Sequence, residues 1–322
     1  MNENLDIRQL VLEAEERCRP FLWETPLEYS HYLSDLSGAK VSLKLDLVQK
    51  TTSFKLRGAT NKIMALSDDE VSRGVVTAST GNYAFAVAEA ISHRHQTATT
   101  YVAKNIDPSR LELMQALGLK VVIHGEEAGA AELEARRVAQ AEGKIYVSPY
   151  NDPLVVGGQG TCGLEISRQL PDLDAAVFAV GGGGLIGGAG GWLKAFNPGI
   201  EIYGVSPENS PVMYESLKAN RIIDMETFPT LADTCAGGVD HDAITLDLCQ
   251  QIIDEMFLLS EEEIENAIRQ IFEHHRLVAE GSAAMSVGAL LKHPEHFEGK
   301  KVVLVLCGRN IDIARFKSII CS

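Results

Sequence analysis

Short apolar runs rich in β-branched residues alternate with helical patterns along this chain of 322 residues. Such runs are typical of strands buried on both faces, and their alternation with helices predicts a parallel sheet of the α/β class. The predicted strands are Val41–Leu45, Gly74–Ala78, Thr97–Ala103, Leu119–His124, Ala175–Val180, Glu201–Val205, Glu255–Leu259 and Lys301–Leu306. The predicted helices include Asn82–His93, Pro108–Leu117, Glu126–Glu142, Ser260–His275 and Ala279–Leu291.

The chain has 29 Lys and Arg residues against 44 Asp and Glu residues, a net charge of −15. A protein this acidic repels nucleic acid and anionic membranes, so we expect neither as a partner. The uncharged run Ala175–Leu193 has the length of a membrane span, but its many glycines make it a poor helix. Six scattered cysteines without CxxC spacing, and a polar start without a signal peptide, predict a cytoplasmic protein with reduced thiols.

Open α/β sheets bind ligands at the carboxyl ends of their strands, and four segments of this chain have unusual chemistry for such a position. The first contains Lys55, which lies between the apolar residues Phe54 and Leu56 at the start of a helical pattern. Partial burial would lower the pKa of this amine and free it for Schiff-base chemistry. A surface lysine whose stem lies along the protein is the alternative.

The second segment follows a predicted strand and opens a predicted helix, and it reads Ser79-Thr80-Gly81-Asn82-Tyr83. Small residues at a helix N-terminus leave several N–H groups free to bind an anion, and a carboxylate would suit this loop. The alternative is an ordinary helix cap made by Ser, Thr or Asn.

The third segment is the run of four glycines Gly181–Gly184, again between a predicted strand and a helix. Backbone without Cβ atoms can wrap a phosphate and present its N–H groups, which favours a phosphate-binding turn over a purely structural one. The run also contains a GxGxxG pattern ending at Gly187, with Glu208 about 20 residues further on, a weak match to a dinucleotide-binding fingerprint.

The fourth segment follows the last predicted strand and contains Cys307 and Arg309. At the end of a strand, the Cys307 side chain is placed to point into a ligand crevice. A buried structural cysteine is the alternative.

Together these segments resemble the fold-type II pyridoxal-phosphate enzymes, specifically the serine/threonine dehydratase family, which includes serine racemases. The resemblance implies a tryptophan-synthase-β-like α/β fold with two open, mostly parallel sheets covered by helices. It also implies a small lobe, residues 73–147, inserted in a large lobe formed by residues 1–72 and 148–322. The small lobe is expected to close over the substrate, and a homodimer is the habit of the family.

The resemblance further assigns roles to individual residues. Lys55 would carry the Schiff base of pyridoxal 5′-phosphate, Phe54 would lie against its ring, and Cys307 would meet its pyridine nitrogen. The phosphate would be bound by Gly181, Gly182, Gly183, Gly184 and Leu185. The substrate carboxylate would be surrounded by Ser79, Thr80, Gly81, Asn82 and Tyr83, with Asn82 also reaching the 3′-oxygen of the cofactor.

The implied reaction is α,β-elimination from a β-hydroxy amino acid such as L-threonine or L-serine, giving a 2-oxo acid and ammonia. Lys55 would remove the Cα proton, and a neutral Cys307 would leave the ring nitrogen unprotonated, which favours elimination. Thr80 stands where racemases carry a serine that acts as a second base, so a serine or amino-acid racemase is an alternative. More remote alternatives are an NAD-dependent oxidoreductase and a non-catalytic amino-acid-binding protein.

The sequence departs from the family pattern at three positions near these motifs. Tyr83 and Phe85 replace a histidine and a glutamine of the family loop. Arg309 replaces a glycine, and it either pairs with an acidic group of the protein or binds a second carboxylate of the substrate. The second option corresponds to a hydroxyaspartate-type dehydratase.

No metal is expected. Several relatives bind a divalent cation through a Glu and an Asp near the phosphate loop, where this chain has Ser206 and Val212. This cation site is therefore expected to be lost, with a shifted Glu208 as the alternative ligand. The histidines, His293 and His296 among them, are interpreted as surface residues that lack Cys or acidic partners at ligand spacing.

Overall fold

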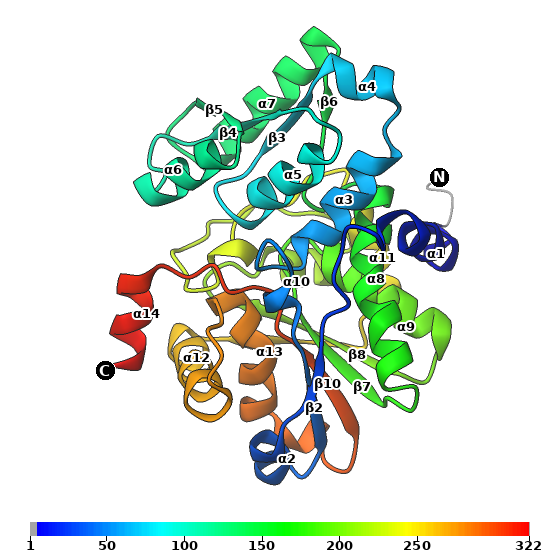
Figure 1. The fold of residues 1–322 in the computed structure, drawn as a ribbon. Helices are drawn as coiled ribbons and strands as arrows, with labels where there is room; N and C mark the ends of the chain where they lie inside the picture. Colours follow the sequence, from blue (N-terminus) through cyan, green and yellow to red (C-terminus); the bar gives the residue numbers. More distant parts are fainter. Residues whose placement is uncertain (1–4, 322) are drawn as a thin grey trace.

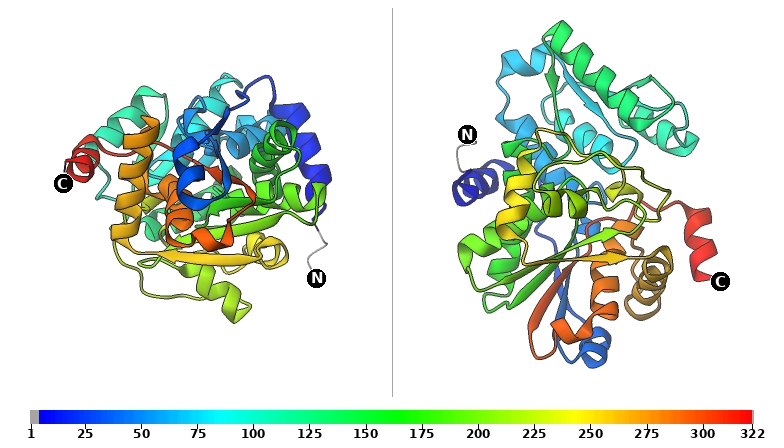
Figure 2. Two further views of the ribbon diagram at one scale, coloured as in Figure 1. Left: turned by 90° about the horizontal axis from the view of Figure 1, so that it is seen from below. Right: turned by 180° about the vertical axis from the view of Figure 1, so that it is seen from behind.

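The computed structural model describes residues 5–321 and contains two sheets with helices on their faces (Figures 1 and 2). The larger sheet has six strands in the order β1-β2-β10-β7-β8-β9, and the smaller has four in the order β5-β4-β3-β6. All pairings within these two sheets are parallel except that of β1 with β2. The fold is therefore the expected α/β arrangement of two open, mostly parallel sheets.

The strands of the larger sheet are β1 (Leu27–Tyr29), β2 (Lys40–Lys44), β7 (Ala175–Ala179), β8 (Glu201–Pro207), β9 (Glu255–Leu259) and β10 (Lys301–Val305). The strands of the smaller sheet are β3 (Val75–Ala78), β4 (Ala98–Val102), β5 (Lys120–Ile123) and β6 (Ile145–Tyr146). All eight predicted strands are confirmed, with no end displaced by more than two residues. The sequence analysis missed β1 and β6, because runs of three and two residues are too short to show an alternating pattern.

The helices that precede the glycine turn Gly181–Gly184 are α1 (Ile7–Cys18), α2 (His31–Ser37), α3 (Lys55–Ala65), α4 (Asp68–Arg73), α5 (Asn82–Ser92), α6 (Pro108–Ala116), α7 (Ala128–Glu142) and α8 (Pro153–Gln169). Those that follow it are α9 (Gly191–Phe196), α10 (Val212–Ala219), α11 (Ile244–Ile252), α12 (Glu261–His275), α13 (Gly281–Lys292) and α14 (Ile313–Ile320). The five predicted helices are confirmed as α5, α6, α7, α12 and α13.

The larger sheet lies between two layers of helices, with α13 on one face and α8 and α9 on the other (Figure 1). All five side chains of β7 are buried, as expected for a central parallel strand. The uncharged run that begins with β7 continues as a glycine turn, a π-helical turn Ile186–Gly190 and α9. No helix within residues 5–321 is long and apolar enough to cross a membrane.

The smaller sheet packs against α7 on one face and α5 on the other. Helix α3 packs in turn on α5, so the apolar cluster on that side combines Val75 and Val102 of the sheet with Leu56, Ala59 and Ile63 of α3. This core therefore extends to residues before 73. The predicted lobe boundaries at 73 and 147 stay a prediction.

Candidate active site

Lys55 is the first residue of α3, and the chain around it is fixed beside the end of β10. Ser53 forms an isolated antiparallel bridge with Gly308. The backbone N–H of Phe54 donates a hydrogen bond to the carbonyl of Cys307 at 2.9 Å. Two segments more than 250 residues apart in sequence thus meet at the carboxyl edge of the larger sheet.

The side chain of Lys55 is half-buried, and its Nζ donates to the carbonyl of Pro149 at 3.2 Å. The same Nζ lies 5.0 Å from the ring centre of Phe54 and 5.7 Å from that of Tyr83. Burial of the ammonium lowers the pKa of Lys55, although nearby groups such as Cys235 oppose the shift. Lys55 is therefore a more available amine than an exposed lysine, as the sequence predicts.

The four glycines Gly181–Gly184 form the turn between β7 and the π-helical turn. Gly183 has φ of +81°, and a Cβ at Gly182 would lie 2.5 Å from the ring of Tyr150. Beside the turn lies Thr245, with its Cβ 3.0 Å from the position of a Cβ at Gly183, and its buried hydroxyl has no hydrogen-bond partner among the described residues. A cradle of bare backbone with an unpartnered hydroxyl fits a phosphate group.

A small cavity brings the amine, the glycine turn and the strand-end cysteine together. Its lining consists of Phe54, Lys55, Tyr150, Ala179, Gly181, Gly182, Gly183, Gly184, Leu185, Thr234, Cys235 and Cys307. Burial raises the pKa of Cys307 well above its ordinary value, so its thiol is neutral near pH 7. The predicted cofactor residues Phe54, Leu185 and Cys307 thus share one cavity with Lys55, as the resemblance implies for a cofactor held by both its ring and its phosphate.

A second cavity of about 280 Å³ adjoins the first through shared lining residues such as Lys55. All five residues of the predicted carboxylate loop, Ser79, Thr80, Gly81, Asn82 and Tyr83, line it. The N-cap residue of α5 is Gly81, which has no side chain to accept hydrogen bonds from the helix. The first N–H groups of α5 are therefore free to bind an anion.

Glu280 is a member of the site to which the sequence analysis gave no role. Its side chain is buried, and its carboxylate accepts hydrogen bonds from Asn82 Nδ2 at 2.9 and 3.0 Å. It also accepts from the hydroxyl of Thr234 at 3.0 Å and from the backbone N–H of Asn310 at 2.9 Å. Burial raises the pKa of Glu280 above its ordinary value, although the hydrogen bond from Asn82 opposes this.

The arginine at the site is Arg110 of α6, which the sequence analysis missed. Arg110 lines the cavity of about 280 Å³, and its Nη2 lies 3.3 Å from Asp233 Oδ2. Arg309 is exposed and does not line this cavity. No sequence signal marks Arg110, because it lies in an ordinary helix outside every motif.

Tyr83 and Phe85, which replace the family's histidine and glutamine, are both buried in α5. The hydroxyl of Tyr83 has no hydrogen-bond partner among residues 5–321, and burial raises its pKa well above the ordinary value. Phe85 lines a larger outer cavity of about 540 Å³, next to Thr80. Both substitutions make this part of the site more apolar than the family pattern.

Ser206 and Val212, the two positions at which the sequence analysis expects a lost cation site, are both buried. The Ser206 hydroxyl donates to the carbonyl of Val180 at 2.8 Å, so it is already used within the protein. The loss of this cation site stays a prediction.

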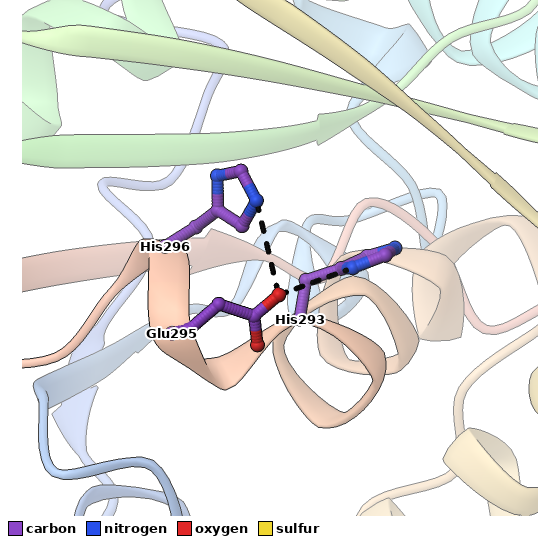
Figure 3. A group of neighbouring side chains, drawn as sticks. All are labelled: His293, Glu295 and His296. Atoms are coloured by element: carbon purple, nitrogen blue, oxygen red, sulfur yellow. Dashed lines mark ion pairs between the residues drawn. The ribbon is translucent and has the colours of Figure 1, made fainter.

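The prediction that His293 and His296 lack an acidic partner is wrong. Glu295 lies between them, with its Oε1 3.6 Å from His293 Nδ1 and 3.9 Å from His296 Nε2 (Figure 3). The tight turn Pro294–His296 brings the Glu295 carboxylate close to both rings, and the spacing of these residues in the sequence does not reveal this placement.

Comparisons with known proteins agree with this geometry. Residues 19–308 match the family described as pyridoxal-phosphate dependent enzyme. An L-threonine ammonia-lyase of Thermotoga maritima is 41% identical over 96% of this chain and 77% of its own length. The structure of threonine deaminase isoform 2 from Solanum lycopersicum superposes with a TM-score of 0.92 and 31% identity, covering 99% of this chain and 93% of that one. Maize serine racemase superposes with a TM-score of 0.91 and 29% identity, covering 97% and 95%.

The match extends over most of the chain and includes Lys55, the glycine turn and Cys307. Similarity of this extent is not explained by a shared fold alone, because the relatives also agree in sequence. The chain belongs to the family of pyridoxal-phosphate dependent enzymes.

Proposed function

We propose that this protein is an ammonia-lyase that converts a β-hydroxy amino acid, such as L-threonine or L-serine, to a 2-oxo acid and ammonia. The observation that carries the proposal is the position of Lys55, whose amine lies between the glycine turn and the carboxylate loop in two adjoining cavities. The similarity to L-threonine ammonia-lyase and threonine deaminase supports the same reaction.

Pyridoxal 5′-phosphate, when bound, supplies an electron sink for the negative charge that forms when the Cα proton leaves. Gly181–Gly184 and Leu185 would hold its phosphate, and Phe54 would pack against its ring. Cys307 would face the ring nitrogen as a neutral thiol, because burial raises its pKa. A neutral partner there favours prompt loss of the β-hydroxyl over storage of charge.

Lys55 is proposed as the general base that takes the Cα proton. A base is most effective when its pKa is near the working pH, and burial lowers the pKa of Lys55 toward that range. The substrate loses water across its Cα–Cβ bond, and a water molecule later returns to Cα as ammonia leaves, so the net products are one 2-oxo acid and one ammonia.

Ser79, Thr80, Gly81, Asn82 and Tyr83 are proposed to bind the substrate carboxylate at the start of α5. The positive end of the helix dipole and the free N–H groups there favour an anion. Asn82 would also reach the 3′-oxygen of the cofactor.

Racemisation is the second candidate activity, because Thr80, which carries a hydroxyl, lines the same cavity as Lys55. A base on each face of Cα would allow proton removal from one side and return from the other. The fold similarity to maize serine racemase is consistent with this alternative.

A dicarboxylic substrate, such as a hydroxyaspartate, would need a cation for its second carboxylate. Arg309 is the candidate from the sequence, and Arg110 is the candidate that lines the cavity. Arg110 belongs to the predicted small lobe and pairs with Asp233, so this ion pair would also help to close residues 73–147 over the substrate.

We further propose that the protein is a cytoplasmic homodimer, following the family habit. Cys18, Cys162, Cys235, Cys249, Cys307 and Cys321 are all free thiols, which supports a reducing compartment. Light scattering coupled to gel filtration measures the oligomeric state, and a monomeric mass would contradict the proposal.

The test is release of ammonia and 2-oxo acid over a panel of L-threonine, L-serine and hydroxyaspartate, with Lys55→Ala as the blank. Chiral chromatography of the remaining amino acid measures racemisation in the same samples. Lyase turnover that disappears in Lys55→Ala supports the proposal. Racemisation without ammonia would replace it with the second candidate, and neither product would favour a non-catalytic amino-acid-binding protein.

A further inference from the structure

Three potential metal ligands lie together on one turn at the edge of the larger sheet. They are His293, Glu295 and His296, and their ligand atoms all lie within 4.8 Å of one another (Figure 3). Within residues 5–321 this is the one group of His, Cys and acidic side chains with such spacing. Metal–nitrogen and metal–oxygen bonds of about 2.0–2.2 Å would draw these atoms slightly closer.

Aromatic contacts fix both imidazole rings in place. The ring of His293 stacks on Phe257 of β9, with a centroid distance of 4.6 Å and an interplanar angle of 22°. The ring of His296 meets the same phenyl ring edge-on at 5.2 Å, and it meets Tyr203 at 6.2 Å. Rings held by packing lose less entropy when they bind an ion than freely rotating surface histidines lose.

The two nitrogens of His296 face different carboxylates. Nδ1 lies 3.3 Å from Glu255 Oε2, whereas Nε2 faces Glu295. When Nδ1 carries the proton, its N–H can donate a hydrogen bond to the Glu255 carboxylate. The lone pair of Nε2 is then free to bind a metal ion. Metal-binding histidines commonly have this arrangement, because a carboxylate on the far nitrogen fixes the tautomer and raises ligand basicity.

We propose that His293 Nδ1, His296 Nε2 and Glu295 bind a divalent transition-metal ion of the zinc type, with Glu255 orienting His296. Two imidazoles and one carboxylate are ligands that zinc, nickel and copper prefer, whereas magnesium and calcium prefer oxygen ligands alone. Glu295 is 66% exposed, so a fourth position is open to water. The carboxylates of Glu255 and Glu295 also offset the charge of the ion.

This site is separate from the catalytic cavities. Glu255 is the first residue of β9, and the turn Pro294–His296 precedes β10. Both therefore lie at the amino edge of the parallel sheet, whereas Cys307 and the glycine turn follow the carboxyl ends of β10 and β7. A bound ion would brace the turn between α13 and β10, and Glu255 would link β9 to this turn through His296, without any contact to substrate or cofactor.

The test is titration of the holoenzyme with zinc chloride by calorimetry, after treatment with a chelating resin and with the thiols kept reduced. One zinc ion per chain is expected to bind to the wild-type protein, and this binding is expected to be lost in His293→Gln and in His296→Gln. Glu255→Gln should retain the site with about 10–100-fold weaker affinity, the usual effect of removing an outer hydrogen-bond partner. His241→Gln is the matched control, because His241 is an exposed histidine that pairs with Asp224 and belongs to no such cluster within residues 5–321.

Unchanged zinc binding in both His293→Gln and His296→Gln would overturn the proposal and place the ion elsewhere, for instance on cysteines. Absence of zinc binding to the wild-type protein would overturn it equally. The melting temperature without zinc shows whether each variant is folded. Glu295→Gln provides an independent measurement if a histidine variant does not fold, because this exposed side chain is not part of the core. In that variant the proposal requires at least about tenfold weaker zinc binding.

Discussion

The side-chain amide of Asn82 donates a hydrogen bond to each oxygen of the buried Glu280 carboxylate, at 2.9 and 3.0 Å. Asn82 opens α5, which packs on the smaller sheet, and Glu280 precedes α13, which packs on the larger sheet. The side chain of Asn310 also donates to Asn82 Oδ1. The Glu280 carboxylate thus positions an asparagine that is proposed to contact substrate and cofactor.

Glu280→Gln is expected to lower kcat/KM by about 10–100-fold, because Asn82 loses an acceptor and small displacements in a site are costly. Asn82→Asp should be at least as damaging, since it sets two carboxylates against each other. The double variant Asn82→Asp with Glu280→Gln restores a donor–acceptor pair and should recover part of the activity. Steady-state kinetics measure all three, and strictly additive losses would show that Glu280 does not act through Asn82.

The lowered pKa of Lys55 predicts its reactivity in protein from which the cofactor has been removed. An amine with a lowered pKa becomes neutral at a lower pH, so labelling of Lys55 by an amine reagent should reach its midpoint below the ordinary value of 10.5. Lys218 is the internal control, because its hydrogen bond to Glu215 raises its pKa above that value. Mass spectrometry of the two labelled peptides measures both midpoints, and equal midpoints would contradict burial of the Lys55 amine.

Gly183→Ala is expected to weaken cofactor binding about tenfold or more. A left-handed conformation costs a residue with a Cβ roughly 1–2 kcal/mol, and that Cβ would lie 2.9 Å from Cys249 Sγ. Gly299→Ala is the control, because Gly299 has a similar φ of +75° but no atom within 4 Å of its Cβ position. If both variants retain the same cofactor affinity, measured by absorbance titration, the glycine turn does not hold the phosphate.

Arg57, two residues after Lys55, anchors α3 through a buried ion cluster. Its Nε lies 2.7 Å from Asp46 Oδ2 and its Nη2 lies 2.8 Å from Glu165 Oε2, which Lys44 Nζ also contacts at 2.7 Å. All four side chains are fully buried. Burial would raise the pKa of Glu165, but Arg57 and Lys44 outweigh it and hold that pKa well below its ordinary value of 4.5.

Arg57→Ala is expected to lower the free energy of unfolding by about 3–5 kcal/mol, because it leaves two buried carboxylates with too little positive charge. Arg137→Ala, which breaks an exposed pair with Glu134, should cost less than about 1 kcal/mol. Urea denaturation measures both.

Because the pKa of Glu165 is lowered in the folded state, the contribution of this carboxylate to stability is fully present above pH 4.5 and should fade as the pH falls below that value. A wild-type protein whose stability does not change in that range would contradict the ionised cluster.

Substitution of Arg110 and substitution of Arg309 are expected to affect turnover of a dicarboxylic substrate differently. Arg110→Ala should lower kcat/KM for hydroxyaspartate by about 10–100-fold more than for threonine, because a hydrogen bond between charged groups is lost. Arg309→Ala should change both substrates by less than about twofold relative to wild type, since Arg309 is exposed. The reverse pattern would assign the second carboxylate to Arg309, and equal losses on both substrates would assign it to neither arginine.

The sequence by itself determined the strands, the main helices and the chemical identity of the site's parts, because these depend on local patterns. Apolar runs mark β2 to β5 and β7 to β10, and the lysine, glycine and cysteine segments stand at strand ends or helix starts. The edge strand β1 and the two-residue β6 escaped because strands so short show no period.

The tertiary structure alone decided which groups meet. Glu280 lies 198 residues from Asn82, and Arg110 lies 123 residues from Asp233, so no local pattern relates them. Burial is likewise a property of the assembled molecule, and it is burial that separates Arg110 at the cavity from the exposed Arg309. The pKa values of Lys55, Cys307 and Glu280 depend on the same desolvation, which exists only once both sheets and their helices have packed.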